Sequence, residues 1–581
     1  MTTDTTPYAA IEAAAAPSFS LDGKTLFHLR GAGLQQVWAL DLETGAAHPL
    51  TSHDEKVALV RRAPDDDRLI YGIDAGGDER QQLWLFDGTS RALTDAADVI
   101  HGFGAWHKDG ARFSLTANDR DPAHYDILIQ DLASGARTRL HEGRHEMTVG
   151  PWHKDGTRLV ATQDHATGDQ RPFILTLDGV ATPIPCPRPA GYGSLRWDGD
   201  SLLGLTDGPT GFTALCAIDP ATGAVSPVFA PESREVDAWA LSPGGALLAT
   251  IENDRGYGVL RVGPRHGDRP IVAGFEQGVA ADLSWSPDGA KLAFAWSAPE
   301  RPSGLYLWQD GTVTPAWQPQ FDLPTRPFHL VEWPTFDDRR IPGWLALPAA
   351  KAPPAGHPAV IWVHGGPASQ ARANFRPDMQ ALLAAGYAVL MPNVRGSTGY
   401  GRASMESDDR EKRLDTVHDL AAGRHFLAAQ DGIDPDRIAV IGQSYGGYMV
   451  NAAITEYPDL WKTAVNYYGI ADFVTLLENT GPWRRDHRSQ EYGDLVRHRA
   501  LFDRISPIRH VDRVRAPVLL LHGRRDPRVP FSESEQIDEA LRLRQRKVRF
   551  ETFDYAGHGF VRPDDKRRVY RAVAEWLHEH L

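Results

Sequence analysis

The stretch that decides the fold of the second half of the chain reads Ile438-Ala439-Val440-Ile441-Gly442-Gln443-Ser444-Tyr445-Gly446-Gly447-Tyr448-Met449. It starts as a short apolar, β-branched run, which is typical of a buried strand, and continues into a segment that we expect to be helical to about Tyr457. Between the two stands Gly-x-Ser-x-Gly, the pattern of a sharp turn that exposes a serine above a sheet. Residues larger than glycine at 442 and 446 would collide with the backbone of such a turn. The motif therefore predicts that Ser444 is a nucleophile.

Other apolar runs in this half have the same character. They are Ala359–Val363, Ala388–Met391 and Val518–Leu521, and we expect helices at Pro377–Ala385 and Leu414–Gln430. Strands that are apolar on both faces belong in a parallel sheet covered by helices. The pattern predicts an α/β-hydrolase domain with a doubly wound, mostly parallel sheet, in which reactive groups lie on loops at the carboxyl ends of the strands.

A serine hydroxyl needs a base, and the base needs an orienting acid. In this fold the acid follows the serine, and the histidine follows the acid. Asp526 comes directly after the strand Val518–Leu521, and His558 stands between glycines after the strand-like run Val548–Phe553. We therefore predict that Ser444, Asp526 and His558 form a catalytic triad.

Three other residues compete for these roles. His522 precedes the acid and His364 precedes the serine, so we expect each to pack or to orient a loop. Asp554 lies on the same strand-to-loop segment as His558, and we expect it to be solvated.

An acyl-transfer site also needs hydrogen-bond donors aimed at the developing oxyanion. One expected donor is the backbone N–H of Tyr445, immediately after the nucleophile. The second usually comes from the loop after an earlier strand, where this chain has Val363-His364-Gly365-Gly366-Pro367. A plain tight turn is the alternative interpretation of that loop.

The first half of the chain repeats one phrase. An aromatic or apolar residue and a Ser or His precede a turn, usually Asp-Gly, and a β-rich run such as Lys24–Leu29 follows. The turns stand at positions 22, 66, 109, 155, 198, 244 and 288, a period near 44. Asp-Gly is a tight-turn signal, and several short strands per repeat without a helical stripe are typical of propeller blades. We therefore predict a seven-bladed β-propeller at 17–322 and the hydrolase domain at 323–581, because the repeat stops near Gln320.

Composition restricts the function further. The chain has 581 residues, of which 42% are hydrophobic and 24% charged, so it is globular and too long for one core. The net charge of −14 argues against a nucleic-acid partner. Two cysteines, Cys186 and Cys216, cannot build a disulfide framework and lack metal-ligand spacing. No run reaches the ~18 apolar residues of a membrane span, and the amino terminus lacks a signal pattern. We expect a cytoplasmic protein with no cofactor, no metal and no membrane partner.

A seven-bladed propeller followed by an α/β-hydrolase domain resembles the prolyl oligopeptidase family of serine peptidases over essentially the whole chain. Phrases similar to its acylaminoacyl-peptidase (acylpeptide hydrolase) branch are His364–Pro367, Pro392–Gly401, Gly442–Tyr448 and Asp526–Pro530. A helical amino-terminal extension, 1–16, packing on the hydrolase domain also suits that branch. The resemblance implies short peptide substrates, a homo-oligomer, an oxyanion hole formed by the N–H groups of Gly366 and Tyr445, and a contact of Arg528 with the substrate backbone.

Two other branches of the family differ from this chain at known positions. The dipeptidyl-peptidase branch uses a pair of glutamates in the propeller region, and this chain has no adjacent Glu-Glu. In the prolyl oligopeptidase branch a tyrosine hydroxyl serves the oxyanion hole, from a position that His364-Gly365-Gly366 fills here. Arg524 and Arg525, beside the triad acid, are either surface cations or ligands for a substrate carboxylate, in which case carboxyl-terminal trimming follows.

Three functions are therefore open. The first is a serine peptidase that releases blocked amino-terminal residues from short peptides, with an oligopeptidase or carboxypeptidase of the same family as a variant. The second is a carboxylesterase with a gating propeller, and the third is an interaction scaffold with an inert hydrolase half. A complete Ser–Asp–His set argues against the third. Residues after the elbow helix either line an apolar substrate pocket or form core: Phe473, Val474, Leu477 and Trp483.

Overall fold

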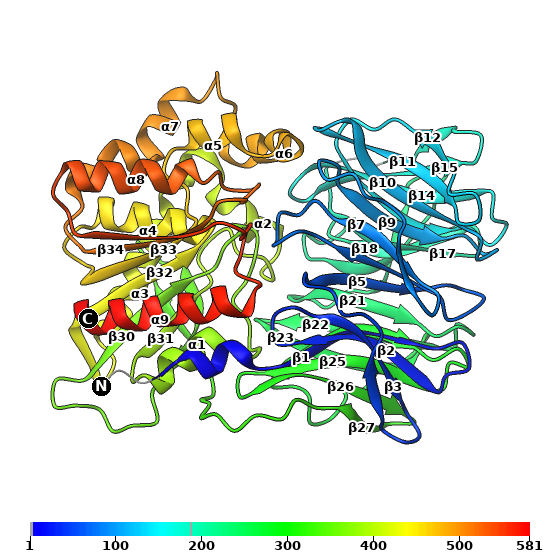
Figure 1. The fold of residues 1–581 in the computed structure, drawn as a ribbon, viewed down its shortest axis with the longest axis horizontal. Helices are drawn as coiled ribbons and strands as arrows, with labels where there is room; N and C mark the ends of the chain where they lie inside the picture. Colours follow the sequence, from blue (N-terminus) through cyan, green and yellow to red (C-terminus); the bar gives the residue numbers. More distant parts are fainter. Residues whose placement is uncertain (1–3, 186–188) are drawn as a thin grey trace.

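The computed structural model describes residues 4–185 and 189–581, so Cys186 falls outside the described part. The chain forms two bodies that lie against each other, a β-propeller and an α/β domain (Figure 1). Within the described residues, no helix combines the length and apolar character needed to cross a membrane.

The propeller consists of five separate four-stranded sheets and one seven-stranded sheet within the described residues. The separate sheets are β1–β4, β5–β8, β9–β12, β13–β16 and β17–β20, each paired antiparallel, and the larger sheet runs from β21 to β27. The strand bounds are β1 Ala13–Phe19, β2 Thr25–Gly31, β3 Gln36–Asp41, β4 Ala47–Pro49, β5 Val57–Arg62, β6 Leu69–Ile73, β7 Gln82–Phe86, β8 Ser90–Ala92, β9 His101–Trp106, β10 Arg112–Asp121, β11 His124–Asp131, β12 Arg137–His141, β13 Glu146–Trp152, β14 Arg158–Ala166, β15 Asp169–Thr176, β16 Ala181–Pro183, β17 Tyr192–Asp198, β18 Ser201–Thr206, β19 Ala214–Ile218, β20 Val225–Phe229, β21 Glu235–Leu241, β22 Leu247–Asp254, β23 Tyr257–Pro264, β24 Val279–Trp285, β25 Leu292–Ala298, β26 Arg301–Gln309 and β27 Thr312–Trp317.

Two residues of the repeated sequence phrase, the glycine and the tryptophan, have a structural role. Its glycine closes a turn between two paired strands; Gly23, Gly110 and Gly289, for example, have φ of 73°, 64° and 72°, a region that favours glycine. Its tryptophan ties one sheet to the preceding one: Trp197 Nε1 donates to Pro151 O at 3.0 Å and Trp106 Nε1 to Arg61 O at 3.3 Å. The period therefore reflects both a turn and a contact between neighbouring sheets.

The ring closes where the first sheet meets the last. Ala14, Phe19 and Leu26 share one buried cluster with Ala293 and Leu305. The expected seven blades do not form seven separate sheets, because β23 and β24 are joined through the single parallel pair Gly258–Val279.

The amino-terminal extension is shorter than expected. A 3₁₀ helix, η1, covers Thr6–Ala10 and packs against α1 and α9 of the hydrolase domain, and the Tyr8 hydroxyl donates to Pro324 O at 2.5 Å. The prediction of helix up to residue 16 is wrong, because Ala13–Ala16 lies in β1. Pairing of Ala13 with Gly31 and burial of Ala14 outweigh the helical preference of alanine.

The hydrolase domain is built on an eight-stranded sheet in the order β28-β29-β31-β30-β32-β33-β34-β35. Strands β28 and β29 pair antiparallel, β29 pairs antiparallel with β31, and the remaining pairs are parallel. The strand bounds are β28 His329–Pro334, β29 Arg340–Ala346, β30 His357–Val363, β31 Ala388–Pro392, β32 Ile433–Gln443, β33 Thr463–Tyr467, β34 Val518–Gly523 and β35 Val548–Phe553.

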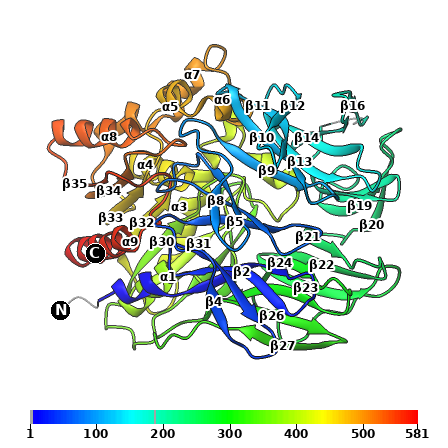
Figure 2. The same cartoon turned by 45° about the vertical axis from the view of Figure 1, so that its right-hand side comes forward.

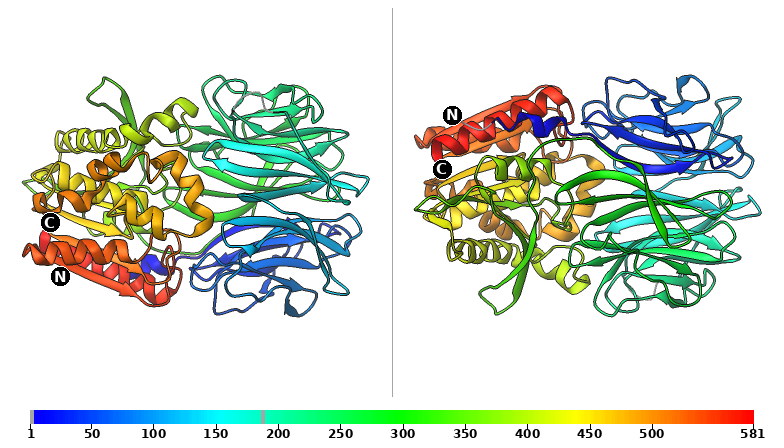
Figure 3. Two further views of the ribbon diagram at one scale, coloured as in Figure 1. Left: turned by 90° about the horizontal axis from the view of Figure 1, so that it is seen from above. Right: turned by 90° about the horizontal axis from the view of Figure 1, so that it is seen from below.

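Helices cover both faces of this sheet, and each face has its own buried cluster. Helices α1 and α9 pack on one face, and α3, α4 and α8 on the other. Figure 1 shows α4 and α8 above the strands and α9 below them, and the view from below in Figure 3 brings α9, in red, to the front. The bounds are α1 Pro377–Ala384, α2 Arg402–Met405, η2 Glu406–Asp408, η3 Arg410–Lys412, α3 Asp415–Ala428, α4 Tyr445–Glu456, α5 Phe473–Asn479, α6 Pro482–Tyr492, α7 Arg499–Ile505, η4 Pro507–Arg513, α8 Ser532–Leu543 and α9 Pro563–His580. The predicted doubly wound α/β domain is present.

Candidate active site

Ser444 stands at the turn between β32 and α4, as the sequence pattern predicts. Its backbone has φ 57° and ψ −119°, a conformation that is strained for a residue other than glycine. The flanking glycines are needed for space: a Cβ on Gly442 would lie 2.3 Å from Gly446 O, and one on Gly446 would lie 2.2 Å from Val363 O. This packing holds the serine hydroxyl at the carboxyl edge of the sheet.

The three predicted triad residues form one hydrogen-bonded chain. His558 Nδ1 lies 2.7 Å from Asp526 Oδ2, and His558 Nε2 lies 3.0 Å from Ser444 Oγ. A carboxylate only accepts, so Nδ1–H is the donor to Asp526 and Nε2 of the neutral ring accepts from the serine hydroxyl. This is the tautomer that a general base for Ser444 requires.

Asp526 is held as a carboxylate by its surroundings. The backbone N–H groups of Arg528 and Val529 donate to its Oδ1 at 2.8 and 3.0 Å. Burial opposes ionisation, but the charge of His558 and the hydrogen bonds from His522 and His558 outweigh it, and the pKa of Asp526 lies well below its usual value. Asp526 therefore stays ionised and can orient the imidazole of His558 at neutral pH.

The competing residues have other partners. His522 is fully buried, with Nδ1 2.8 Å from Ser534 Oγ and Nε2 3.0 Å from Val529 O, so it orients the loop that carries Asp526. His364 is buried too, and its Nε2 lies 3.0 Å from Ser397 Oγ. Asp554 is exposed and accepts from Arg524 Nε at 3.0 Å.

Two backbone N–H groups are placed to serve an oxyanion. Gly366 and Tyr445 line one small pocket together with Ser444, and within the described residues neither N–H donates to another group. The loop of Gly366 lies against the nucleophile, since a Cβ on Gly365 would be 3.3 Å from Ser444 Cβ. A side chain at 365 would therefore have little room, and Gly366 has φ 131°, a region that favours glycine.

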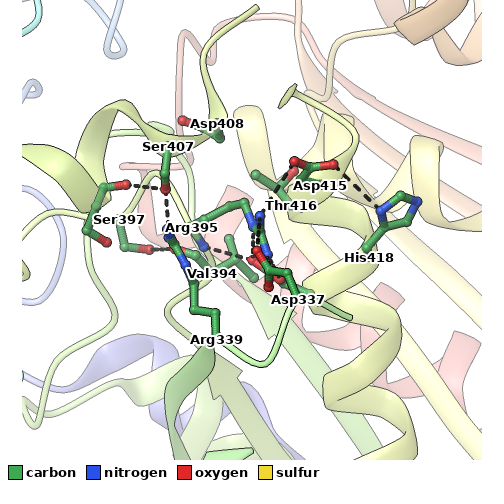
Figure 4. Close-up of polar contacts among 12 residues, drawn as sticks. Asp337, Arg339, Val394, Arg395, Ser397, Ser407, Asp408, Asp415, Thr416 and His418 are labelled. Carbon is green, nitrogen blue, oxygen red and sulfur yellow. Dashed lines mark hydrogen bonds and ion pairs between the residues drawn. The ribbon is translucent and has the colours of Figure 1, made fainter. Parts of the chain in front are cut away.

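The segment Pro392–Gly401 supports this loop from behind. Ser397, which contacts His364, donates to Val394 O at 2.6 Å. Arg395 is buried and pairs with both oxygens of Asp419 at 2.8 Å, and Asp337 faces the same guanidinium (Figure 4). These contacts give the segment a structural role beside the site rather than a place in the chemistry.

The pocket beside Ser444 is lined by residues that the sequence analysis did not single out. Besides Arg528 they are Ile470, Leu476, Thr480, Arg484, Arg488, Tyr492 and Val529. Arg484 and Arg488 stand four residues apart on α6, so they lie on one face of that helix. The sequence shows this spacing and so predicts that the two arginines share a helix face, but nothing in the sequence places α6 next to Ser444.

Three predicted substrate contacts need correction. Phe473 is fully buried in the hydrolase core, its ring packed on Tyr448 and Tyr492. Trp483 packs against a cluster of the propeller. Arg525 is exposed and lies over the Tyr555 ring, outside the pocket beside Ser444. Val474 and Leu477 are core residues.

The propeller reaches this site through the loop between β6 and β7. Gly557 N–H donates to Gly76 O at 2.8 Å and His558 N–H to Gly77 O at 3.2 Å. From the same loop Glu79 pairs with Arg528. Figure 2 shows the two bodies meeting along this face. The loop that carries the base is therefore held partly by the propeller.

The chain is similar to known proteins. The model of the prolyl oligopeptidase family matches residues 373–581. Dipeptidyl aminopeptidase BIII of Pseudoxanthomonas mexicana is 29% identical over 88% of this chain and 78% of its own length. The acylamino-acid-releasing enzyme of Arabidopsis thaliana is 31% identical over 38% of this chain, and the match spans only 30% of that relative.

Solved structures share the whole fold. A puromycin-hydrolyzing peptidase of Mycobacterium tuberculosis superposes with a TM-score of 0.88 at 22% identity, covering 100% of this chain and 96% of its own. The acylaminoacyl peptidase of Pyrococcus horikoshii gives 0.78 at 19% identity, covering 100% and 98%. The fold and the relatives define a serine hydrolase. More specifically, residues 373–581 match the prolyl oligopeptidase family of serine peptidases, and the chain is similar along most of its length to a dipeptidyl aminopeptidase.

Proposed function

We propose that this serine peptidase acts on short peptides and releases blocked, acylated amino-terminal residues through an acyl-enzyme on Ser444. The observation that carries the proposal is the continuous chain from Ser444 Oγ through His558 to Asp526, beside two backbone N–H groups without a partner in the described structure. In this proposal Ser444, His558 and Asp526 are the catalytic residues, and the N–H groups of Gly366 and Tyr445 bind the oxyanion.

The reaction follows from that arrangement. Ser444 Oγ attacks the substrate carbonyl while its proton passes to His558 Nε2, and the carbonyl oxygen becomes an oxyanion facing Gly366 and Tyr445. Collapse breaks the C–N bond, and His558 returns the proton to the leaving amine. A water then attacks the acyl-enzyme, gives its proton to His558, and the ester C–O bond breaks as Ser444 recovers a proton.

The ion pair of Glu79 supports a substrate whose amino terminus is blocked. A peptidase that binds a free ammonium offers it a carboxylate near the site, and Glu79, the carboxylate of the propeller loop that contacts the segment of His558, is already paired with Arg528. A second candidate, release of dipeptides with a free amino terminus, is favoured by the likeness to a dipeptidyl aminopeptidase along 88% of the chain.

The test compares acetyl-alanyl anilides, alanyl-alanyl anilides with a free amino terminus, and simple esters. Preference for the acetylated anilide supports our proposal, and preference for the free dipeptide supports the second candidate. Hydrolysis of esters alone would indicate a carboxylesterase. Labelling by a fluorophosphonate, abolished in Ser444→Ala, checks the nucleophile separately.

We further propose that the enzyme excludes folded proteins. The propeller lies over the hydrolase face, and its loop is hydrogen-bonded to the segment of His558. A folded domain of 100 residues has a radius of gyration of about 13 Å, too wide to reach a covered serine. Blocked peptides of rising length should show a sharp cutoff, whereas digestion of a folded protein would mean that the site is open.

We also propose that the seven-stranded sheet counts as two blades, which makes seven in all, with the propeller at 17–322 and the hydrolase domain at 323–581. Support comes from the single residue pair that joins β23 to β24 and from the turn phrases at 244 and 288. The boundary is supported by the gap between β27, which ends at Trp317, and β28, which begins at His329.

A further inference from the structure

The pocket beside Ser444 contains more positive charge than its apolar walls would suggest. Three of its lining residues are Arg484, Arg488 and Arg528. Arg528 pairs with Glu79, and Arg488 Nη1 lies 2.8 Å from Glu491 Oε2. Each of these two guanidinium groups therefore has its own carboxylate.

Arg484 is different. Within the described residues its guanidinium makes no hydrogen bond and no ion pair, although Arg485, the next residue along α6, donates to Glu478 O at 2.6 Å. Burial and then the charges of Arg488 and Arg528 lower the pKa of Arg484 to about 10, so it remains protonated at neutral pH.

The carboxylates around Arg484 do not pair with it in the part of the chain that the structure describes. Glu79 and Glu146 are near enough to raise the pKa of Arg484, but within the described residues neither forms an ion pair with it, and Glu79 pairs with Arg528 instead. Burial lowers the pKa of His487 to about 4, so this neighbour on α6 is neutral at pH 7. A half-buried cation without a partner is costly, and the cost is recovered when an anion enters.

The geometry indicates which part of the substrate would enter. In the acyl-enzyme, the acyl carbon is bonded to Ser444 Oγ and its oxygen faces Gly366 and Tyr445, and all three of these residues line the pocket. His558, which protonates the leaving amine, does not line it. The pocket therefore receives the side chain of the residue that donates the acyl group, not the leaving peptide.

We propose that Arg484, with Arg488 beside it, binds the side-chain carboxylate of the residue on the acyl side of the scissile bond, so that the enzyme prefers glutamate or aspartate there. This inference rests on the proposed function and specifies its substrate. A guanidinium fork matches a carboxylate through paired N–H donors, which makes it more selective than a point charge.

The test measures kcat/KM for acetyl-glutamyl, acetyl-glutaminyl and acetyl-alanyl anilides. Glutamate and glutamine have nearly the same shape, so their ratio isolates the charge. We expect the glutamyl substrate to be favoured by about 10- to 100-fold, the value of a charge-assisted hydrogen bond. In Arg484→Met this ratio should fall to near one.

Two variants serve as controls. Arg485→Met removes a neighbouring arginine of the same helix that does not line the pocket, and it should keep the glutamyl preference. Arg484→Lys should keep part of it, because a point charge replaces the fork. The rate at which an uncharged fluorophosphonate labels Ser444 shows whether the catalytic site of Arg484→Met is intact. This probe carries no carboxylate, so its rate does not depend on the proposed interaction.

The outcomes separate the alternatives. Equal rates for glutamyl and glutaminyl substrates in the wild type, or an unchanged ratio in Arg484→Met, would overturn the proposal. A further result would also overturn it: the wild type prefers peptides with a free carboxyl terminus over the same peptides as amides, and Arg484→Met loses that preference. The carboxylate bound by Arg484 would then belong to the leaving side of the substrate. If no anilide is cleaved and Ser444 is not labelled, the proposed function fails instead.

Discussion

The two bodies of this molecule are stabilised in different ways. In the propeller, strands pair in the order of the sequence, and the buried side chains form small clusters, several of them between neighbouring sheets. In the hydrolase domain the strand order is crossed, and two large clusters flank one sheet. Every residue of the hydrogen-bonded Ser444–His558–Asp526 chain belongs to the second body. The difference indicates that the chemistry depends on long-range packing, whereas the propeller holds the base loop and restricts access.

The largest expected effect lies at the hydrolase turn. Ser444→Ala should lower kcat by on the order of 10⁶, because the acyl-enzyme can no longer form. The unfolding transition should be unchanged, since alanine fits the same backbone with less bulk. Activity assays with circular dichroism check both parts. Substantial residual turnover would mean that another residue is the nucleophile. The chemistry could then no longer be assigned to the hydrolase domain alone.

The next effect concerns the acid. Asp526→Asn should keep the shape but favour the wrong imidazole tautomer of His558, at a cost of on the order of 10⁴ in kcat. Asp554→Asn is the matched control, because this exposed residue pairs with Arg524 and, among the residues that the structure describes, with no other cation; we expect a change below about twofold. The reverse result would mean that the orienting carboxylate is misassigned.

A much smaller effect is expected where the bodies meet. Glu79→Gln breaks the pair with Arg528 across the interface, and partly exposed pairs contribute about 0–1 kcal/mol. We expect a change of a few-fold in kcat/KM, since Arg528 lines the pocket, and little change in the free energy of unfolding. Glu12→Gln, which breaks the pair with Arg30 near the start of the propeller, is the control and should leave the kinetics unchanged. A loss as large as that of Asp526→Asn would show that the propeller takes part in the chemistry.

The smallest effect tests the propeller alone. Gly289 has φ 72°, and a Cβ there would lie no closer than 3.5 Å to its nearest neighbour, Pro243 Cδ, so Gly289→Ala isolates backbone strain. We expect a loss of about 1 kcal/mol in the free energy of unfolding and no change in kcat/KM. Urea denaturation combined with the anilide assay checks this. A matching loss of activity would indicate that strain in one blade is transmitted to Ser444.

Much of the site was predictable because its signals are local. The elbow around Ser444 has steric requirements within five residues, and Asp526 and His558 each follow a buried strand that ends at the same edge of the sheet. The rejection of His522 and His364 as bases also needed only chain order. The errors arose where a contact joins distant segments: Trp483 packs on the propeller, Phe473 lies in the core, and Ala13–Ala16 pairs as a strand.

The sequence by itself determined the two kinds of architecture and the three residues of the expected triad, because turns, periods and strand ends are encoded within a few residues. Only the tertiary structure decided what surrounds Ser444. It brought Arg484 and Arg488 from α6 into the pocket, left Arg484 without a partner among the described residues, and set the loop of Gly76 and Gly77 against His558. These contacts depend on how helices and loops pack over the sheet. The local sequence around a residue does not show which distant segment it will contact.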